Sequence, residues 1–121
     1  MIIVDTSIWV DYLRSGNEAL GALLGAGLVL VHPFVAGELA LGVWPERNVV
    51  LRTLADLPRS EVATNGEVLG FIERHGLYGR GVGYVDVHLW AAAQLIAACE
   101  LWTGDRRLYR VARSLDLAWG E

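Results

Sequence analysis

The chain has 121 residues, a length that suits one domain built around one hydrophobic core. Apolar residues make up 54% of it, which excludes a disordered chain and suggests that part of the surface is buried against a partner. The net charge is −4 and all ten basic residues are arginine, so the missing lysine excludes P-loop nucleotide binding, Schiff-base catalysis and the receiver site of response regulators.

The sequence shows no feature of a membrane or exported protein. No apolar run reaches the length of a membrane span, and residues 1–4 are too short and uncharged for a secretory signal. We therefore expect a cytoplasmic protein that does not contact membranes. The single Cys99 cannot form an internal disulfide, and its apolar surroundings indicate a small core residue.

The first part of the chain alternates short apolar runs with helical patterns. Residues 2–4 predict a buried strand, and Asp5-Thr6-Ser7 opens a helix with a residue type that caps helices. A break at residues 15–17 separates it from a second helix, which ends by Gly27. Residues 28–31 form a continuous apolar run of strand length, as is typical of parallel sheets.

The middle of the chain is mainly helical. Pro33 begins a helix that Pro45 breaks, and residues 46–57 resume the helical spacing of apolar residues. Residues 60–63 predict a marginal strand. Asn65 then caps a helix that runs to about residue 75.

The last part begins with a glycine-rich loop at residues 76–83. A helix apolar on nearly all sides follows at about residues 85–98 and should be buried. Residues 101–102 predict a short strand, residues 105–114 a final helix, and residues 117–119 an edge strand.

Strands and helices therefore alternate along the whole chain. This order predicts a three-layer α/β/α domain with a central, mainly parallel sheet and right-handed crossovers. The chain contains no internal repeat, low-complexity tract or linker, so we expect residues 1–121 to form a single domain.

Four acidic residues stand where this fold would gather them: Asp5, Glu38, Asp86 and Asp105. Asp5 and Asp105 follow predicted strands, and in a parallel sheet functional groups collect at the carboxyl ends of strands. Glu38 and Asp86 lie in the early turns of apolar helices that start at the same edge. We therefore expect all four carboxylates to meet in one cleft.

Carboxylates gathered in this way repel one another, and a divalent cation removes that penalty. Oxygen ligands suit hard ions such as Mg²⁺ or Mn²⁺, which keep waters and bind phosphates. The implied chemistry is phosphodiester hydrolysis by a metal-activated water.

Each acid also has a structural interpretation. Asp5 and Asp105 could each cap a helix, and Asp86 could complement a helix dipole in a first turn. Glu38 lies among apolar residues, where an unpartnered acid is rare. The functional interpretation depends on all four occurring together.

Four stretches of the chain carry a resemblance to a known family: MIIVDTSIWVDYLR, HPFVAGELALG, GRGVGYVDVHLWAAA and LWTGDRRLYRVA. In this order and spacing the chain resembles the PIN-domain ribonucleases, and among them the VapC toxins of toxin–antitoxin systems. The resemblance covers essentially the whole chain.

The resemblance implies a PIN fold, a Mg²⁺- or Mn²⁺-dependent endoribonuclease, an RNA substrate, a VapB-type antitoxin and a homodimer. The four acids match the catalytic and metal-binding quartet of the family. The hydroxyls of Thr6, Ser7 and Thr103 match residues beside it, where they would orient a carboxylate or a metal-bound water.

Arginines follow the fourth acid directly, at Arg106, Arg107, Arg110 and Arg113. Arg106, Arg110 and Arg113 fall on one face of the predicted helix. As a group the arginines could guide an RNA backbone to the cleft or pair with acidic groups of an antitoxin. The alternative for each one is a solvated position on the helix surface.

Two other functions remain as alternatives. A phosphatase of the haloacid-dehalogenase type requires a second Asp two residues after the first, where this chain has Ser7. A phosphoacceptor receiver requires a lysine, and this chain has none. A non-catalytic binding module with a PIN fold would be favoured by the loss of an acid, and all four are present.

Overall fold

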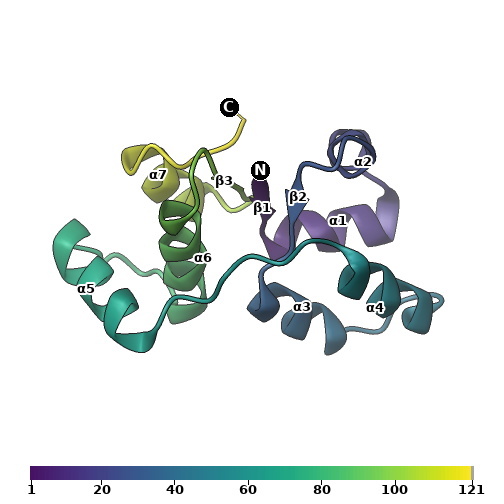
Figure 1. The fold of residues 1–121 in the computed structure, drawn as a ribbon, viewed down its shortest axis with the longest axis horizontal. Helices are drawn as coiled ribbons and strands as arrows, with labels where there is room; N and C mark the ends of the chain where they lie inside the picture. The colour runs from purple at the N-terminus through teal and green to yellow at the C-terminus, as the bar shows by residue number, and fades with distance from the viewer. Residues whose placement is uncertain (121) are drawn as a thin grey trace.

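A parallel sheet lies at the centre of the structure, a computed structural model that describes residues 1–120. β1 (Ile2–Val4) is the middle strand, with β2 (Val29–Leu30) on one side and β3 (Glu100–Trp102) on the other (Figure 1). Both pairings are parallel, so the three strands end at the same edge of the sheet.

The sheet is apolar because both of its faces are covered. The register aligns Ile3 with Leu30 on β2 and with Leu101 on β3, and all three side chains are buried. Strands covered on both faces have continuous apolar sequences, as predicted for the first two strands.

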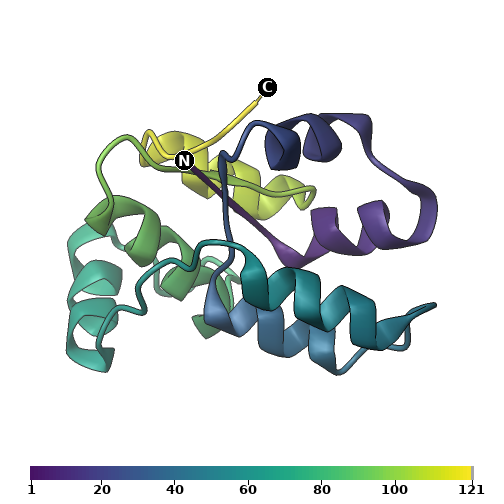
Figure 2. The ribbon, with the colours of Figure 1, turned by 45° about the vertical axis from the view of Figure 1, so that its right-hand side comes forward.

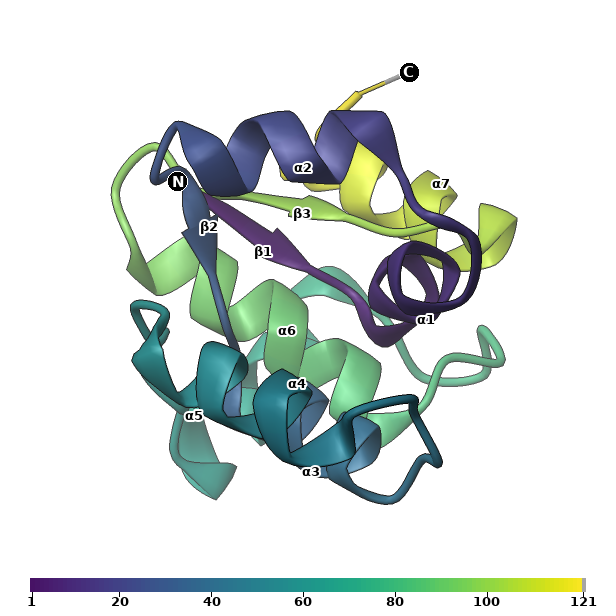
Figure 3. The same cartoon turned by 90° about the vertical axis from the view of Figure 1, so that its right-hand side faces the viewer.

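The helices of residues 1–120 form two layers around this sheet. In Figures 2 and 3, α2 and α7 lie on one side of the sheet and α6 lies on the other. This confirms the predicted three-layer α/β/α architecture. The helices are α1 (Thr6–Ser15), α2 (Glu18–Gly25), α3 (Pro33–Ala40), α4 (Arg47–Asp56), α5 (Asn65–His75), α6 (Tyr84–Leu95) and α7 (Arg106–Ser114). Among the described helices, none combines the length and apolarity that a bilayer crossing requires.

Side chains that cap helix N-termini fix where several helices begin. Asp5 accepts a hydrogen bond from the backbone of Thr6 at the start of α1, and Asn17 accepts one from Leu20 at the start of α2. Asp105 caps α7 in the same way. These residues satisfy backbone N–H groups that have no partner inside the helix.

The predicted start of α5 was wrong by one residue. Thr64 is the N-cap, and its side chain accepts a hydrogen bond from the Glu67 backbone while the Glu67 carboxylate accepts one from Thr64 N. This reciprocal pair satisfies two backbone donors, which makes Thr64 a better cap than Asn65.

The buried helix α6 ends earlier than predicted, at Leu95 instead of residue 98. Ile96 has an extended backbone and Ala98 a positive φ of 53°, so the chain turns into β3 at this point. The apolar residues past Leu95 continue the helical pattern without being helical. Cys99, in this turn, is buried as predicted.

The two weakest predicted strands are isolated bridges. Arg59 bridges Val31, but Pro33 begins α3 two residues later, so no ladder can extend over residues 60–63. Ala118 bridges Leu101 at the outer edge of β3. The predicted strand at residues 60–63 was therefore wrong. The predicted edge strand at residues 117–119 is present as a single bridge, in which Leu117 O and Trp119 N hydrogen-bond to the backbone of Leu101.

Candidate active site

The four predicted acids come from four different elements around the carboxyl edge of the sheet. Asp5 follows β1 directly, Glu38 lies on α3, Asp86 lies in the first turn of α6, and Asp105 lies between β3 and α7. The parallel pairing of β1 with β3 places the first and last of these side by side at one edge.

The charges of the other three acids act on Asp86 and affect its pKa. Burial raises the pKa of Asp86 above its usual value, and a hydrogen bond from the backbone N–H of Gly83 acts in the opposite direction. The charges of Asp5, Glu38 and Asp105 raise this pKa further, because each of them disfavours a fourth negative charge. The structure therefore brings the predicted quartet together.

Asp5 is the buried centre of this group, with 7% of its surface exposed. Its Oδ2 accepts hydrogen bonds from Ser7 Oγ at 2.9 Å and from Thr103 Oγ1 at 2.8 Å. Its Oδ1 accepts the backbone N–H of Thr6 at 2.8 Å. These three donors hold the carboxylate in one orientation.

The same hydroxyls connect α1 with the segment that leads into α7. Ser7 Oγ accepts a hydrogen bond from Gly104 N at 3.1 Å, and Thr103 Oγ1 accepts one from Asp105 N at 3.1 Å. The position of Asp105 is thus set by residues that also orient Asp5. The three hydroxyls predicted beside the acids are all used, since Thr6 Oγ1 donates to Glu38 Oε1 at 2.8 Å.

Glu38 does not have the surroundings that the sequence suggested. The apolar residues Val35 and Leu39 are fully buried, but Glu38 is exposed at the rim of the site. A carboxylate beside Leu39 on the helix points away from the core, so the prediction of an acid in an apolar environment was wrong for Glu38. Its hydrogen bond from Thr6 gives it a fixed place beside Asp5.

Asp86 and Asp105 are each held by backbone donors. Asp86 Oδ2 accepts the N–H of Gly83 at 3.0 Å, and Asp105 Oδ1 accepts those of Arg107 at 2.8 Å and Leu108 at 3.2 Å. Asp105 therefore caps α7, and Asp86 lies in the first turn of α6, where the helix dipole favours a carboxylate. These hydrogen bonds leave other carboxylate oxygens free for a ligand, since each bond uses only one oxygen.

The residues present fit a hard divalent cation. The donor set consists of carboxylate and hydroxyl oxygens, which Mg²⁺ and similar ions prefer. Within residues 1–120, no three His, Cys, Asp or Glu side chains are close enough together to form a ready-made metal cage.

The four arginines along α7 differ in their contacts. Arg106, Arg110 and Arg113 are exposed beside Tyr109 along an open groove of about 490 Å³ that begins at Thr103. Arg107, in contrast, donates a hydrogen bond from its Nη1 to Gly81 O at 3.0 Å. The structure thus agrees with the helical spacing, which places Arg106, Arg110 and Arg113 on one face, and it shows the separate contact of Arg107.

Sequence reasoning missed the role of the glycine-rich loop beside the site. Gly83 supplies a backbone donor to Asp86, and Gly81 supplies an acceptor to Arg107. The clustering of glycines was visible in the sequence, but backbone hydrogen-bonding groups carry no residue signature. Only the structure could identify them.

The chain also matches known proteins. Residues 2–114 match the profile of the PIN domain. The chain belongs to the PIN-domain family. Ribonuclease VapC32 of Mycobacterium tuberculosis, found in two strains, is 42% identical to this PIN domain over 121 residues, covering 100% of this chain and 98% of the relative. This similarity places the chain in the VapC group, as the sequence resemblance implied.

A solved structure supports the fold of this PIN domain independently. A chain from the crystal structure of FitAcB from Neisseria gonorrhoeae superposes with a TM-score of 0.66, covering 98% of this chain and 95% of the other. The two share 20% identity, so the match bears on the fold alone. PIN-domain ribonucleases generally depend on divalent metal ions, which agrees with the oxygen donors described above.

Proposed function

We propose that this chain is a VapC-type toxin, a single PIN domain over residues 1–121 that cleaves RNA as a metal-dependent endoribonuclease. The observation that carries the proposal is the network of hydroxyl hydrogen bonds that links Asp5 with Glu38 and Asp105. Burial, and then the charges of these three acids, raise the pKa of Asp86 beside them. Carboxylates are gathered in this way at a cost, and a divalent cation relieves it. The similarity to a protein named a ribonuclease supports the same conclusion.

The four acids would hold Mg²⁺ or Mn²⁺, either directly or through water. Asp5 is the most rigid of them because three donors orient it. Thr6, Ser7 and Thr103 act through these hydrogen bonds, and substitution of such supporting groups typically weakens metal binding by about 10- to 100-fold.

When bound, the metal would supply an activated water and a positive charge that stabilises the phosphate as negative charge develops on it. The protein's own carboxylates would orient that water in line with the scissile bond and accept its proton. Attack of this water on the phosphorus with loss of the 3′-oxygen would leave a 5′-phosphate and a 3′-hydroxyl. The exposed arginines Arg106, Arg110 and Arg113 would bind the RNA backbone on the way to the site.

Two protein partners are part of the proposal, a VapB-type antitoxin and a second copy of the chain. Leu41 and Val43, after α3, are 89% and 94% exposed, and Tyr78 is 69% exposed. Large apolar side chains at such exposure are suited to burial in an interface. The antitoxin would inhibit by placing a basic side chain among the four acids, which have no lysine in this chain to neutralise them. An RNA substrate would be met in the cytoplasm, where we expect the chain to act.

The proposal is tested by incubating the purified, antitoxin-free chain with total RNA in Mg²⁺ or Mn²⁺, beside EDTA and the Asp86→Asn variant. We expect discrete cuts by the wild type, lost with EDTA and with the variant. Sequencing of the new ends should find 5′-phosphates. A folded wild type that binds divalent ions but leaves every RNA intact would contradict nuclease function and favour a non-catalytic binding module.

A further inference from the structure

Arg107 makes a contact that its neighbours on α7 do not share. Its Nη1 donates a hydrogen bond at 3.0 Å to the carbonyl of Gly81, which lies 26 positions earlier in the sequence. Gly81 belongs to the loop at residues 76–83 that joins α5 to α6 and reaches the side of the molecule where α1 and α7 begin (Figure 3). The guanidinium therefore ties this loop to the start of α7.

Arg107 and the loop that it contacts each donate a backbone hydrogen bond to an acid of the proposed site. The backbone N–H of Arg107 donates to Asp105 Oδ1 at 2.8 Å. Two residues after Gly81, the N–H of Gly83 donates to Asp86 Oδ2 at 3.0 Å. Three hydrogen bonds thus connect Asp105 with Asp86, by way of Arg107 and the backbone of residues 81–83.

The contact at Gly81 is closely fitted. Gly81 has a φ of +72°, and a Cβ added to it would lie 2.7 Å from Arg107 Nη1. Gly79, in the same loop, has the same φ of +72°, but a Cβ there would meet open space among the described residues. Any side chain at residue 81 would disturb the contact with Arg107, whereas one at residue 79 would strain only the local backbone.

We propose that Arg107 is a positioning residue that holds loop 76–83 in place and thereby sets the separation of Asp86 and Asp105 for the metal. This inference rests on the proposed function, because it assigns Arg107 a role at the same site. Four glycines give the loop large conformational freedom, so without a further contact Asp86, which follows the loop, is free to move relative to Asp105. The bond from Arg107 restricts that movement before the ion arrives.

The test compares Arg107→Ala and Gly81→Ala with two matched controls. Arg106→Ala removes a charge from the adjacent exposed position, and Gly79→Ala introduces the same backbone strain without meeting Arg107. The first measurement is the Mn²⁺ affinity of the RNA-free protein by calorimetry. The second is the hydrogen-exchange rate of the Gly83 amide, which reports the loop without any activity assay.

We expect Arg107→Ala and Gly81→Ala each to weaken Mn²⁺ binding by about tenfold, as removal of a group that orients a ligand does. Both should speed exchange at Gly83, and the two controls should stay near the wild type. The double variant should bind Mn²⁺ no more weakly than either single variant, because both remove the same hydrogen bond.

The outcomes separate this inference from the proposed function. Wild type that binds Mn²⁺, together with Arg107→Ala that binds it equally well and exchanges Gly83 at the same rate, would overturn the role of Arg107 and leave the nuclease proposal intact. Additive effects in the double variant would overturn the shared hydrogen bond. Wild type that binds no divalent ion would contradict the proposed function itself, while the exchange rates would still report whether Arg107 holds the loop.

Discussion

The ionised side chain of Asp86 lowers the stability of the folded protein. Its pKa is raised, first by burial and then by the neighbouring acids, which means that the folded protein holds a proton on Asp86 more tightly than the unfolded chain does. At neutral pH the ionised side chain therefore destabilises the fold, and stability rises as pH falls through the raised pKa. Such a cost is typical of functional sites.

We predict that Asp86→Asn raises the melting temperature in EDTA at pH 7.5 while it removes RNA cleavage. Asn is uncharged and can still accept the Gly83 N–H through its amide oxygen. Thermal unfolding measures the effect, with Asp11→Asn on the exposed side of α1 as the control. A lower melting temperature for Asp86→Asn would contradict the cost assigned to this acid. Added Mn²⁺ should stabilise the wild type more than the variant.

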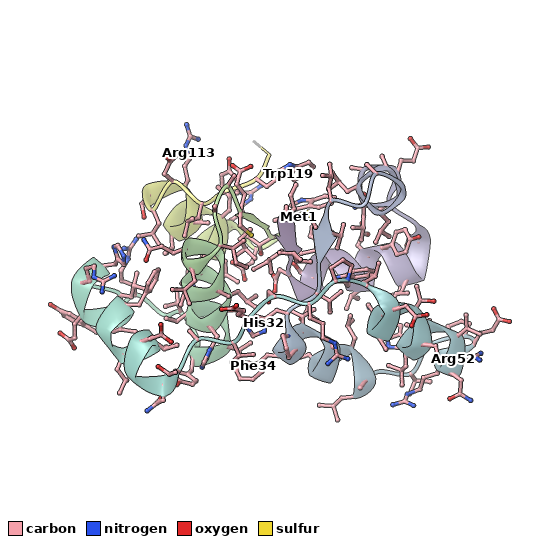
Figure 4. The ribbon with its side chains drawn as sticks, in the orientation of Figure 1. Met1, His32, Phe34, Arg52, Arg113 and Trp119 are labelled. Atoms are coloured by element: carbon pink, nitrogen blue, oxygen red, sulfur yellow. The ribbon has the colours of Figure 1, made fainter. Side chains whose placement is uncertain are left out.

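His32 links the fold to pH at a position outside the quartet. It is fully buried at the start of α3, beside Phe34 and 6.3 Å from the ring of His88 (Figure 4). Burial, and then the charge of His88, lower the pKa of His32 from 6.5 to about 4. Its Nδ1 accepts the Phe34 N–H at 3.0 Å, which requires an unprotonated nitrogen.

The unfolded chain therefore takes up a proton on His32 below pH 6.5, whereas the folded protein resists it until about pH 4. Stability is fully present above pH 6.5 and is lost as pH falls between these values, by up to about 3 kcal/mol. Urea unfolding at pH 7.5 and pH 4.5 measures this loss. His32→Asn keeps a capping acceptor but cannot titrate in this range, so its stability should depend less on pH. An equal loss in the variant would show that other groups are responsible.

Among the helices, α7 carries arginines in two different surroundings. Arg107 faces the glycine-rich loop, whereas Arg110 and Arg113 are exposed along the groove that begins at Thr103. Arg113, at the upper left of the view, lies far from Arg52 on α4 at the lower right (Figure 4). The surface of α7 is thus a basic surface beside the acids.

We predict that replacing both Arg110 and Arg113 with Gln weakens binding of single-stranded RNA in EDTA, where no cleavage occurs. Each neutralised phosphate releases counterions, so the slope of log affinity against log salt should become shallower by about 0.7 for each phosphate that the variant no longer neutralises. Fluorescence anisotropy at several salt concentrations measures the slope. Arg52→Gln removes an exposed charge far from the groove and should leave the slope unchanged. Equal slopes for the double variant and the wild type would exclude these two arginines from the RNA path.

Element boundaries were predicted where a local signal decides them. Asp5 and Pro33 mark helix starts that depend on neighbouring residues alone, and the structure places α1 and α3 there. The Thr64–Glu67 capping box is also a local signal in the sequence, and it defines the start of α5 better than Asn65 does. The end of α6 could not be predicted from the same information, because the turn at Ile96 depends on where β3 pairs with β1.

At the scale of the whole molecule, the sequence predicted the layers and the meeting of the four acids. Alternating strands and helices imply a parallel sheet, and the carboxyl edge of such a sheet collects residues that follow strands. The order β2-β1-β3 was not predicted, because pairing between distant strands leaves no local pattern. For the same reason, the tie between Arg107 and Gly81 and the exposure of Glu38 required the structure.

The central claim is that four carboxylates act as one metal-dependent site that cleaves RNA. The most direct measurement is the cleavage rate of one defined RNA substrate in Mn²⁺ by Asp5→Asn, Glu38→Gln, Asp86→Asn and Asp105→Asn, with Asp11→Asn as the matched control. We predict that each of the four lowers the rate by at least about 100-fold, since the members of one catalytic unit are each required, and that the control cleaves like the wild type. Wild-type rates in any of the four, with the variant folded, would remove that acid from the site, and wild-type rates in all four would contradict the account.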